Sequence, residues 1–314
     1  MNYGVPYKGG KNKIAEKIIK FLPPAENFYD LFAGGCAVAQ VALLSGKYKN
    51  VYINDINGGI TQLFIDSING KYNNENRWIS REDFFTQKET DAFIKYIWSF
   101  SNNGKSYMYS KEIELYKKAY HFAVFGDYSY FAEMGIDVPV INSGNPKERR
   151  LELRKWVVIN EAEIKNKYIK WLGGKIKDIG SENLQNLQNL ERLERLQNLQ
   201  NLQNLQNLER LQNLQNLESL ERLQTITRFN KSYNEIDIKP NSVIYCDIPY
   251  ANTNCGSYNG FNHAEFYEWA RQQQNIYISE YTMPEDFKSV FEIEKRCAIG
   301  RNLTVEKIFI PYKA

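Results

Sequence analysis

The sequence is poor in the residues that build metal centres and disulfide frameworks. It contains two histidines, His121 and His263, and four cysteines, and no cysteine pair has C-x-x-C spacing. Structural zinc sites need clustered cysteine and histidine ligands, which this sequence lacks. A chain of 314 residues can also bury a large core without cross-links. We therefore expect no structural metal, and we expect free thiols at Cys36, Cys246, Cys255 and Cys297.

Long apolar runs are absent as well. No stretch approaches the roughly 18 apolar residues of a membrane span, and residues 1–10 contain no apolar signal core. The sequence therefore favours a cytoplasmic protein over one that is secreted or inserted in a membrane. A strong excess of either charge is also missing, because 40 Lys and Arg face 37 Asp and Glu. The net charge of +3 permits binding to nucleic acid but indicates it only weakly.

Two segments of the chain carry the pattern of an α/β sheet. In the first, an amphipathic run over residues 11–21 precedes two short strands that end near Phe32 and Asp55, with a helical stretch between them. The second begins at Asn241 and contains three short apolar runs, each suited to a strand of the same sheet. Residues 58–179 lack strand patterning and are rich in aromatic, charged and amide side chains. The sequence thus predicts an α/β fold with a mainly helical insertion.

A low-complexity repeat, in which leucine recurs at every third position, runs from Leu184 to Leu223. Three residues of an α-helix turn by about 300°, so these leucines spiral around a helix instead of forming one stripe. A strand would place successive leucines on alternate faces, and neither element buries them cleanly. Leu, Gln, Glu and Arg nevertheless favour a helix. We expect a helical spacer or accessory surface outside the active site. Its leucines would need a partner, either another copy of the chain or a groove on this one.

The first candidate site is a strand that runs into two glycines and then a helix, residues 30–35 with the sequence D-L-F-A-G-G. Its glycines let a ligand approach the backbone at a helix N-terminus. Asp55 ends the next strand, where a carboxylate can accept hydrogen bonds from both hydroxyls of a ribose. This pattern indicates a nucleoside cofactor, although an ordinary strand-to-helix turn has the same sequence features. NAD is the weaker candidate because the G-x-G-x-x-G spacing is missing.

The second candidate site is residues 243–250, V-I-Y-C-D-I-P-Y, an apolar strand that delivers an acid, a proline and an aromatic ring into a turn. Asp247 and the main-chain carbonyl of Ile248 can accept hydrogen bonds from an exocyclic amino group, and Tyr250 can stack on a base. The alternative is a plain turn, in which Asp247 caps the loop and Tyr250 packs in the core. Taken alone, these residues leave both interpretations open.

Together the motifs resemble the Dam-like family of adenine-N6 DNA methyltransferases. The family's D-P-P-Y tetrapeptide is similar to residues 247–250, where Ile248 replaces the first proline. Its F-x-G-x-G cofactor motif is similar to residues 32–36, where Cys36 replaces the second glycine. The family's ribose-binding acid corresponds to Asp55.

The resemblance extends to both ends of the chain. Residues 7–11, Y-K-G-G-K, are similar to an N-terminal segment that closes over the cofactor in this family. Residues 261–263, Trp269 and residues 279–281 resemble segments of phage-borne members. The resemblance thus covers most of the chain outside the leucine repeat, and it implies a role in a phage or in restriction-modification.

The activity implied is methyl transfer from S-adenosylmethionine to the N6 amino group of an adenine flipped out of double-stranded DNA. The implied catalytic residues are Asp247, Ile248, Pro249 and Tyr250. The implied cofactor-binding residues are Tyr7, Lys11, Asp30, Phe32, Gly34, Gly35, Asp55 and Asp247. The implied fold is a Rossmann-like methyltransferase sheet. We expect the catalytic domain at residues 1–60 and 236–314, target recognition at 61–180, and the repeat with its linker at 181–235.

Target recognition would fall to cationic and amide side chains of the middle region. The candidate cations are Arg77, Arg81, Lys105, Lys117, Lys118, Arg149 and Arg150, most of which are equally consistent with a solvated surface. Residues 102–105, N-N-G-K, are typical of a loop that enters a DNA groove or of a plain surface turn.

Two rival functions remain at this point. One is a binding module, catalytically weak or inactive, that acts on DNA or protein through its repeat, as Ile248 and Cys36 would allow. The other is a methyltransferase of RNA or protein with a similar tetrapeptide. Transfer of a labelled methyl group to DNA, RNA and protein acceptors separates these functions.

Overall fold

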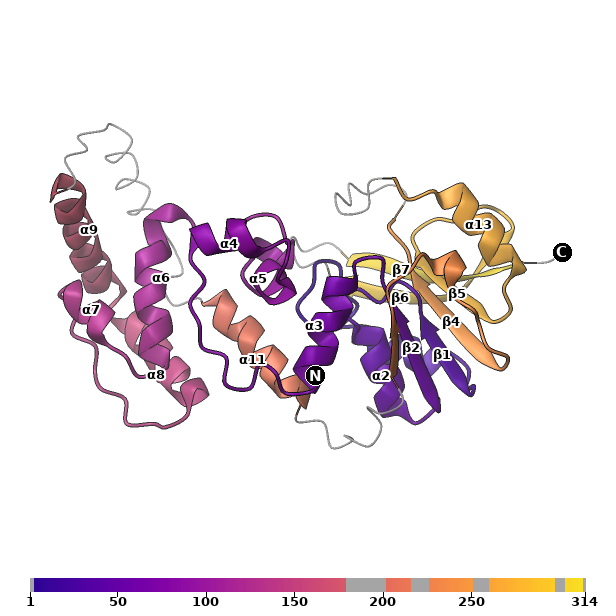
Figure 1. The fold of residues 1–314 in the computed structure, drawn as a ribbon, viewed down its shortest axis with the longest axis horizontal. Helices are drawn as coiled ribbons and strands as arrows, with labels where there is room; N and C mark the ends of the chain where they lie inside the picture. Colours follow the sequence, from indigo (N-terminus) through magenta and orange to yellow (C-terminus); the bar gives the residue numbers. More distant parts are fainter. Residues whose placement is uncertain (1–2, 179–201, 216–225, 251–259, 297–302, 313–314) are drawn as a thin grey trace. The chain divides into compact units, whose positions relative to one another are not determined.

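The computed structural model describes residues 3–178, 202–215, 226–250, 260–296 and 303–312. The chain divides into two compact units, which Figure 1 shows with their helices and strands labelled. Residues 1–73 and 210–314 form the first, here called the sheet unit. Residues 74–209 form the second, the helical unit.

The sheet unit is built on a sheet of seven strands in the order β3-β2-β1-β4-β5-β7-β6. The strands from β3 to β5 are parallel to their neighbours, whereas β7 is antiparallel to both β5 and β6. The strands are β1 (Asn27–Asp30), β2 (Asn50–Asn54), β3 (Ile226–Phe229), β4 (Ser242–Asp247), β5 (Ile276–Glu280), β6 (Phe287–Arg296) and β7 (Leu303–Pro311). The direction of strand order reverses between β1 and β4, which are neighbours in the sheet.

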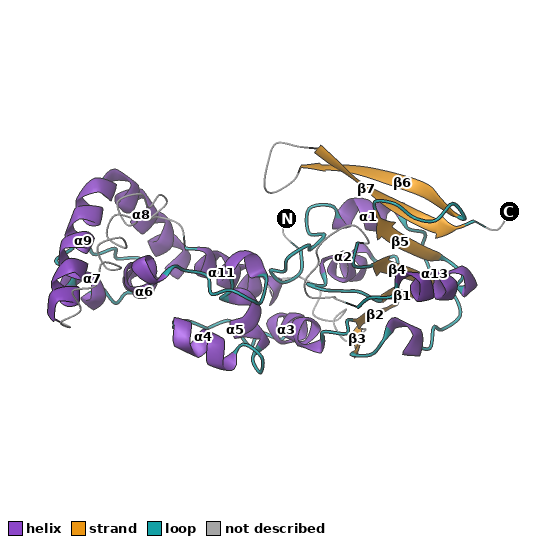
Figure 2. Cartoon of the chain, turned by 90° about the horizontal axis from the view of Figure 1, so that it is seen from above, coloured by secondary structure: helices purple, strands orange, loops and turns teal. Residues whose placement is uncertain are grey.

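Helices cover both faces of this sheet. Figure 2 shows α1 and α2 on one face and α13 on the other. This cover explains the strand sequences, because all four residues of β1 are buried, as expected for a central parallel strand. The helical elements described in this unit are α1 (Ala15–Phe21), α2 (Ala37–Ser45), α3 (Gly58–Ile68), the short 3-10 turn η2 (Tyr233–Glu235) and α13 (His263–Gln272).

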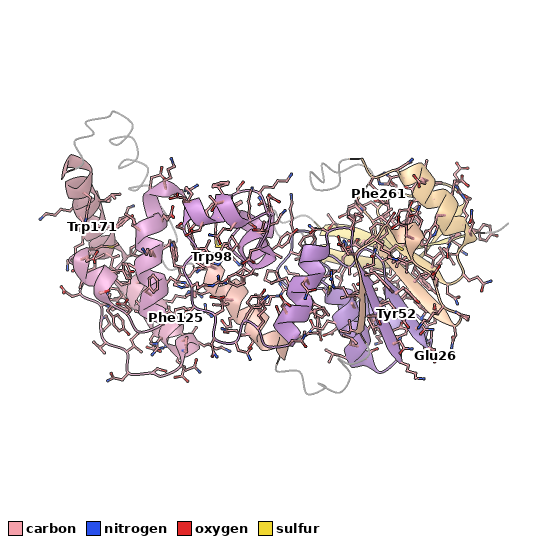
Figure 3. The ribbon with its side chains drawn as sticks, viewed as in Figure 1. Glu26, Tyr52, Trp98, Phe125, Trp171 and Phe261 are labelled. Atoms are coloured by element: carbon pink, nitrogen blue, oxygen red, sulfur yellow. The ribbon has the colours of Figure 1, made fainter. Side chains whose placement is uncertain are left out.

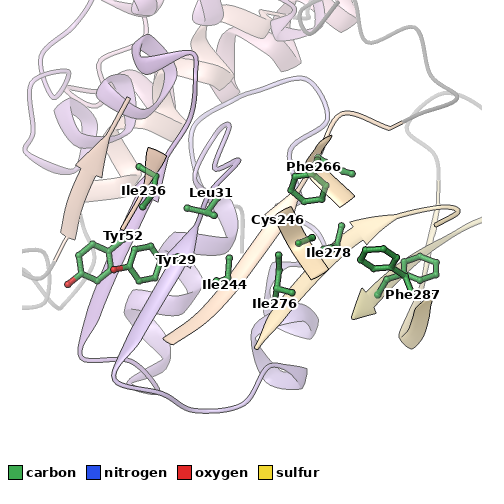
Figure 4. Close-up of a cluster of buried hydrophobic side chains, with 13 residues drawn as sticks. Tyr29, Leu31, Tyr52, Ile236, Ile244, Cys246, Phe266, Ile276, Ile278 and Phe287 are labelled. Carbon is green, nitrogen blue, oxygen red and sulfur yellow. The ribbon is translucent and has the colours of Figure 1, made fainter. Parts of the chain in front are cut away.

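A buried apolar cluster joins the strands to α13 (Figure 4). Ile244 and Cys246 of β4 alternate with residues on the other face and belong to this cluster, together with Phe266 of α13. Tyr29 of β1 stacks on Tyr52 of β2, with ring centroids 4.3 Å apart. The cluster thus fixes β1, β2 and β4, the three strands whose carboxyl ends carry the candidate site residues.

The α/β architecture expected from the sequence is confirmed. The predicted helical stretch at residues 37–45 is α2, and the predicted apolar runs of the second segment are β4, β5 and β7. Strand β3 was not identified, because Ile226–Phe229 alternates only weakly and has no fully buried position. It lies within residues 181–235, which the sequence assigns to the repeat and its linker, yet it pairs with β2 in the sheet.

The helical unit contains α4 (Arg81–Gln87), α5 (Ala92–Ile97), η1 (Phe100–Asn102), α6 (Lys111–Val124), α7 (Ser129–Glu133), α8 (Pro146–Ile159), α9 (Glu161–Asp178) and the first part of α11 (Gln203–Gln215). Aromatic side chains form much of its core, and Figure 3 labels one of them, Trp98. Trp98 and His121 lie 5.8 Å apart between ring centroids, and Trp78 packs against both at 5.0 and 5.5 Å. The aromatic residues that the sequence scatters through this region therefore form a packed helical core.

Helix α11 is part of the leucine repeat, and its apolar side chains are buried. Its leucines and the one just before it are all at most 5% exposed, at positions 202, 205, 208, 211 and 214. Two asparagines of the same helix are buried as well. Asn204 accepts a hydrogen bond from the Tyr109 hydroxyl (2.6 Å) and donates one to His121 Nδ1 (2.9 Å). Asn207 donates to the carbonyl oxygen of Ile97 at 3.0 Å.

These contacts correct two expectations about the repeat. The spiral of leucines is buried by a helix after all, because the five leucines at positions 202–214 sweep about 240° of the helix surface and each is at most 5% exposed. Residues 202–214 are consequently not a spacer or an exposed surface for self-association. The repeat residues 184–201 and 216–223 lie outside the described residues.

We expect Leu211→Ala to lower the free energy of unfolding by about 2–5 kcal/mol, the usual cost of a cavity at a fully buried leucine. Asn213→Ala, at an exposed position two residues along the same helix, is the control and should change it by less than about 0.5 kcal/mol. Urea denaturation followed by circular dichroism measures both. Equal stability of the two variants would contradict the buried position of this repeat unit.

Candidate active site

The candidate site residues gather at the carboxyl ends of three neighbouring strands. Asp30 ends β1, Asp55 follows β2, and Asp247 ends β4. Ligands of open α/β sheets bind at the carboxyl edge where the strand order reverses, which here is the junction of β1 and β4. The topology therefore brings together the two motifs that stand more than two hundred residues apart in the sequence.

The loop after β1 is a tight cradle that excludes larger side chains. Gly34 has a left-handed φ of +45°, and a Cβ atom there would lie 3.0 Å from the Tyr7 ring. A Cβ atom on Gly35 would lie 2.6 Å from the carbonyl oxygen of Val5. Cys36, in the position of the family's second glycine, also adopts a left-handed φ of 58° and begins α2. The backbone thus keeps the glycine-type conformation despite the cysteine side chain.

Asp55 joins the two loops at this edge of the sheet. Its Oδ2 accepts a hydrogen bond from the Gly34 amide at 2.8 Å, and its Oδ1 accepts one from the Asn57 amide at 2.8 Å. The carboxylate is 2% exposed. Asp55 therefore holds the glycine loop in place, a structural role that the sequence did not predict beside its expected contact with a ribose.

Asp30 presents a buried carboxyl group to the same edge. It is 1% exposed, and its Oδ1 has no hydrogen-bond partner among the described residues. Burial, and next the charge of Asp247, raise the pKa of Asp30 well above its usual range, against a hydrogen bond with the Ala39 backbone. A buried polar atom without a partner is costly, which favours a polar ligand at this position.

Asp247 belongs to a cluster of four polar side chains, with Lys11, Tyr250 and Glu306. The Lys11 ammonium lies 2.6 Å from Asp247 Oδ1, 2.7 Å from the Tyr250 hydroxyl and 3.4 Å from Glu306 Oε1. The Tyr250 hydroxyl also donates a hydrogen bond to Glu306. The side chains of Lys11 and Glu306 are 6% and 0% exposed, and that of Asp247 is 20% exposed. The acid of the tetrapeptide is thus more exposed than either Lys11 or Glu306.

The charges of this cluster stabilise one another. Burial lowers the pKa of Lys11, but Asp247 and Glu306 raise it by more, so its net shift is upward. Burial, followed by the charges of Asp247 and Glu306, raises the pKa of the Tyr250 hydroxyl far above its usual range. Lys11 is therefore an ammonium and Tyr250 a neutral phenol at neutral pH.

The rest of the tetrapeptide is fixed by packing and by one histidine. Ile248 is 2% exposed and belongs to the apolar cluster of the sheet, so its side chain has a packing role. His263 Nε2 donates a hydrogen bond to the carbonyl oxygen of Pro249 at 2.7 Å. The ring of Tyr250 meets that of Tyr281 edge to face, with centroids 4.6 Å apart.

The predicted site residues thus fall into two groups. Lys11, Asp247 and Tyr250 contact one another, and Tyr7, Gly34, Gly35 and Asp55 form a connected loop region, with Asp30 at the strand end between them. Phe32 lies apart from these polar groups, because its ring packs against Tyr233, Phe261 and Phe266.

Sequence reasoning missed Glu306 entirely and assigned no role to His263 or Tyr281. A single acid in the apolar segment T-V-E-K-I-F-I, residues 304–310, was the one available signal for Glu306. Buried acids inside apolar strands need a partner, and here that partner is Lys11.

Cys36 and Cys246 are buried free thiols, and the other two cysteines lie outside the described residues. No group of three or more His, Cys, Asp or Glu side chains in the described ranges is arranged to hold a metal ion. Among the helices that the structure describes, none is long and apolar enough to cross a membrane.

Comparison with known proteins assigns the chain to a family. Residues 7–175, more than half of the chain, match the model of the D12 class N6 adenine-specific DNA methyltransferases. The matched range includes the N-terminal segment, the glycine loop and Asp55, whereas the tetrapeptide at residues 247–250 lies beyond it. Comparison with curated proteins gives no match.

Proposed function

The chain belongs to the D12 class of N6 adenine-specific DNA methyltransferases, and we propose that it transfers a methyl group from S-adenosylmethionine to the N6 amino group of an adenine flipped out of double-stranded DNA. The observation that carries this proposal is the position of Asp247 and Tyr250 at the end of β4, beside the glycine loop of β1. As a DNA-modifying enzyme it would act in the cytoplasm of a bacterial or phage-infected cell.

The residues at the edge of the sheet fit this cofactor. The Asp55 carboxylate at the tip of β2 suits the ribose hydroxyls, and the unpartnered Oδ1 of Asp30 suits a polar or cationic part of the cofactor. Gly34 and Gly35 let Tyr7 and the Val5 backbone pack directly against this loop, because a Cβ atom on either glycine would collide with them. When bound, S-adenosylmethionine supplies an electrophilic methyl group on a sulfonium. The chain's own task is to orient the amine and to exclude water.

Orientation of the amine falls to residues 247–250. The adenine N6 lone pair is delocalised into the ring, so the free amine is a poor nucleophile. Asp247 and the Ile248 carbonyl oxygen can accept its two hydrogens and favour a tetrahedral nitrogen. The Asp247 carboxylate is also a base for the proton that the nitrogen sheds. Tyr250, a neutral phenol, can stack on the base and offset part of the cost of flipping.

The helical unit uses most of its predicted DNA-binding cations for its own structure. Arg81 pairs with Glu114 at 3.3 Å, and Arg150 pairs with Glu209 at 2.7 Å. Arg149 donates to backbone carbonyls, and Lys117 is buried, which lowers its pKa to about 7. We therefore do not assign phosphate contacts to these four side chains. Arg77 likewise pairs with Glu75, and Lys118 lies over the ring of Tyr130.

The loop predicted to enter a DNA groove is stabilised by hydrogen bonds of its asparagine side chains. Asn102 Nδ2 donates to the carbonyl oxygen of Tyr96 at 2.7 Å, and Asn103 Oδ1 accepts hydrogen bonds from the amides of Lys105 and Ser106. Ser101 and Asn102 have φ of 54°, a left-handed conformation that this bonding maintains. One amide atom of each asparagine is therefore used to shape the loop.

The same loop presents Phe100 to solvent. This aromatic side chain is 62% exposed, although its amide is held by the carbonyl oxygen of Ser106 at 2.8 Å. An exposed aromatic ring on a rigid loop suits stacking against bases or insertion between them. We include Phe100 in the DNA-binding surface, with the exposed Lys105 beside it.

We expect Asp247→Ala and Asp247→Asn to lower the methyl-transfer rate by roughly 10²-fold or more, because each removes the charged acceptor for the amine. The fold should remain, since Lys11 keeps Glu306 as a counter-charge. Transfer of tritiated methyl groups to DNA measures the rate. Asp66→Asn, which removes one partner of a surface ion pair with Lys71, is the control and should leave it unchanged. Activity of Asp247→Ala above about a tenth of wild type would overturn the role of this acid.

Cofactor binding gives a separate test. Asp55→Ala should weaken S-adenosylmethionine binding by about 1.5–3 kcal/mol, because a charged acceptor is lost. Asp55→Asn keeps one acceptor oxygen for the Gly34 amide. A smaller loss of cofactor affinity in Asp55→Asn than in Asp55→Ala would therefore measure the part that depends on the contact with the glycine loop. Titration calorimetry measures both, with thermal unfolding as the check on folding. Unchanged affinity in a folded Asp55→Ala protein would place the ribose elsewhere.

DNA recognition is tested at the exposed ring. Phe100→Ala should weaken DNA binding by about 1–3 kcal/mol, the range for one base–aromatic stack. Ile159→Ala removes another exposed apolar side chain of the helical unit (81% exposed) and should have no effect on binding. Fluorescence anisotropy with a labelled duplex measures both affinities. Equal affinities of these two variants would remove Phe100 from the DNA-binding surface.

A further inference from the structure

Glu306 is a buried acid in the middle of β7 that neither of the recognised motifs contains. Its side chain is fully buried, whereas the preceding residue, Val305, is 37% exposed. Strand β7 pairs with β5 on one side and with β6 on the other, opposite Ile293. A carboxylate at a buried position loses its hydration, so a charged partner is needed to stabilise it.

The partner is the Lys11 ammonium, which also pairs with Asp247 of the tetrapeptide. An ammonium has three N–H donors, and those of Lys11 lie near Asp247, the Tyr250 hydroxyl and Glu306. The Tyr250 hydroxyl in turn donates to Glu306. Glu306 therefore touches the lysine that neutralises Asp247 and also the ring assigned to stack on the adenine.

We propose that Glu306 is a positioning residue for methyl transfer, which shares the Lys11 ammonium with Asp247 and orients the Tyr250 ring. This inference rests on the proposed function of residues 247–250.

The physical reason is competition for one positive charge. If Lys11 had Asp247 as its single counter-charge, the ammonium would bind that carboxylate more strongly. Asp247 would then be a weaker acceptor for the adenine amine. Glu306 also interacts with the ammonium, which weakens the interaction between Lys11 and Asp247. The more exposed Asp247 therefore remains a strong acceptor for the amine. Glu306 also accepts from the Tyr250 hydroxyl, which fixes the ring without contact to the substrate.

The test compares Glu306→Gln with Glu292→Gln. Glutamine keeps an acceptor for Tyr250 but removes the charge. The control removes an acid of β6 that pairs with Lys307 at 3.4 Å, half exposed and outside the cluster. We expect Glu306→Gln to lower kcat at least about tenfold, the effect of one charge-assisted hydrogen bond, with little change in cofactor affinity. Glu292→Gln should match wild type.

A second readout is independent of activity. The groups that face Lys11 are Asp247 and Tyr250 after β4, Glu306 on β7 and, more distantly, Asp30 on β1. Because Glu306 raises the pKa of Lys11, its replacement by glutamine should lower that pKa. Nuclear magnetic resonance of the Lys11 side chain across a pH titration, in the cofactor-free protein, measures this shift.

The outcomes are distinct. An inactive wild-type enzyme would overturn the proposed function, while the lysine titration would still report on Glu306. A Glu306→Gln enzyme as active as Glu292→Gln, or one with an unshifted Lys11 pKa, would overturn the positioning role. So would an equal loss of kcat and cofactor affinity, which indicates general damage to the fold. If Glu306→Gln does not fold, Glu306→Asp replaces it. The shorter aspartate keeps the negative charge but places the carboxylate farther from Lys11. Full kcat in Glu306→Asp would also overturn the proposal.

Discussion

The Lys11 ammonium joins three parts of the chain that lie far apart in sequence. Its backbone carbonyl accepts the first hydrogen bonds of the turn that leads into α1, and its side chain reaches Asp247 at the end of β4 and Glu306 in β7. A buried ammonium is stable only with its counter-charges, and each acid is buried enough to need the lysine. The position of the Tyr250 ring depends on this same group of charges.

The other half of the site depends on close backbone approach. The N-terminal segment lies against the glycine loop, where the Val5 amide donates to the carbonyl oxygen of Gly35 at 2.8 Å. Asp55 fixes the loop from the other side through the Gly34 amide. The two halves meet because β1 and β4 are neighbours, so the topology of the sheet sets the distance between the glycine loop and Asp247. Charge therefore organises one half and backbone geometry the other.

The sequence predicted the parts of this site that carry local signals. Strand-to-glycine transitions and an acid after an apolar strand are visible in a few consecutive residues, so Gly34, Asp55 and Asp247 were identified. Glu306 was not, because its meaning depends on strand pairing between β5 and β7, which no local pattern reveals. The sequence left open which cationic side chains of the helical unit face DNA and which belong to a solvated surface, for the same reason. Whether an arginine faces DNA or a glutamate is decided by tertiary neighbours, as for Arg150 and Glu209.

The leucine repeat shows how a nearly uniform sequence can occupy one register. Its leucines are interchangeable, but the residues between them are not. Arg210 donates hydrogen bonds to the carbonyl oxygens of Tyr3 and Gly4, and Gly4 leads directly into the segment that holds Gly35. A slip by one triplet would put Asn207 or Asn213 in place of Arg210, and neither side chain is long enough to make both contacts. The glutamate–arginine pair at residues 209–210 therefore specifies the register, and through it the repeat supports the backbone of the glycine loop.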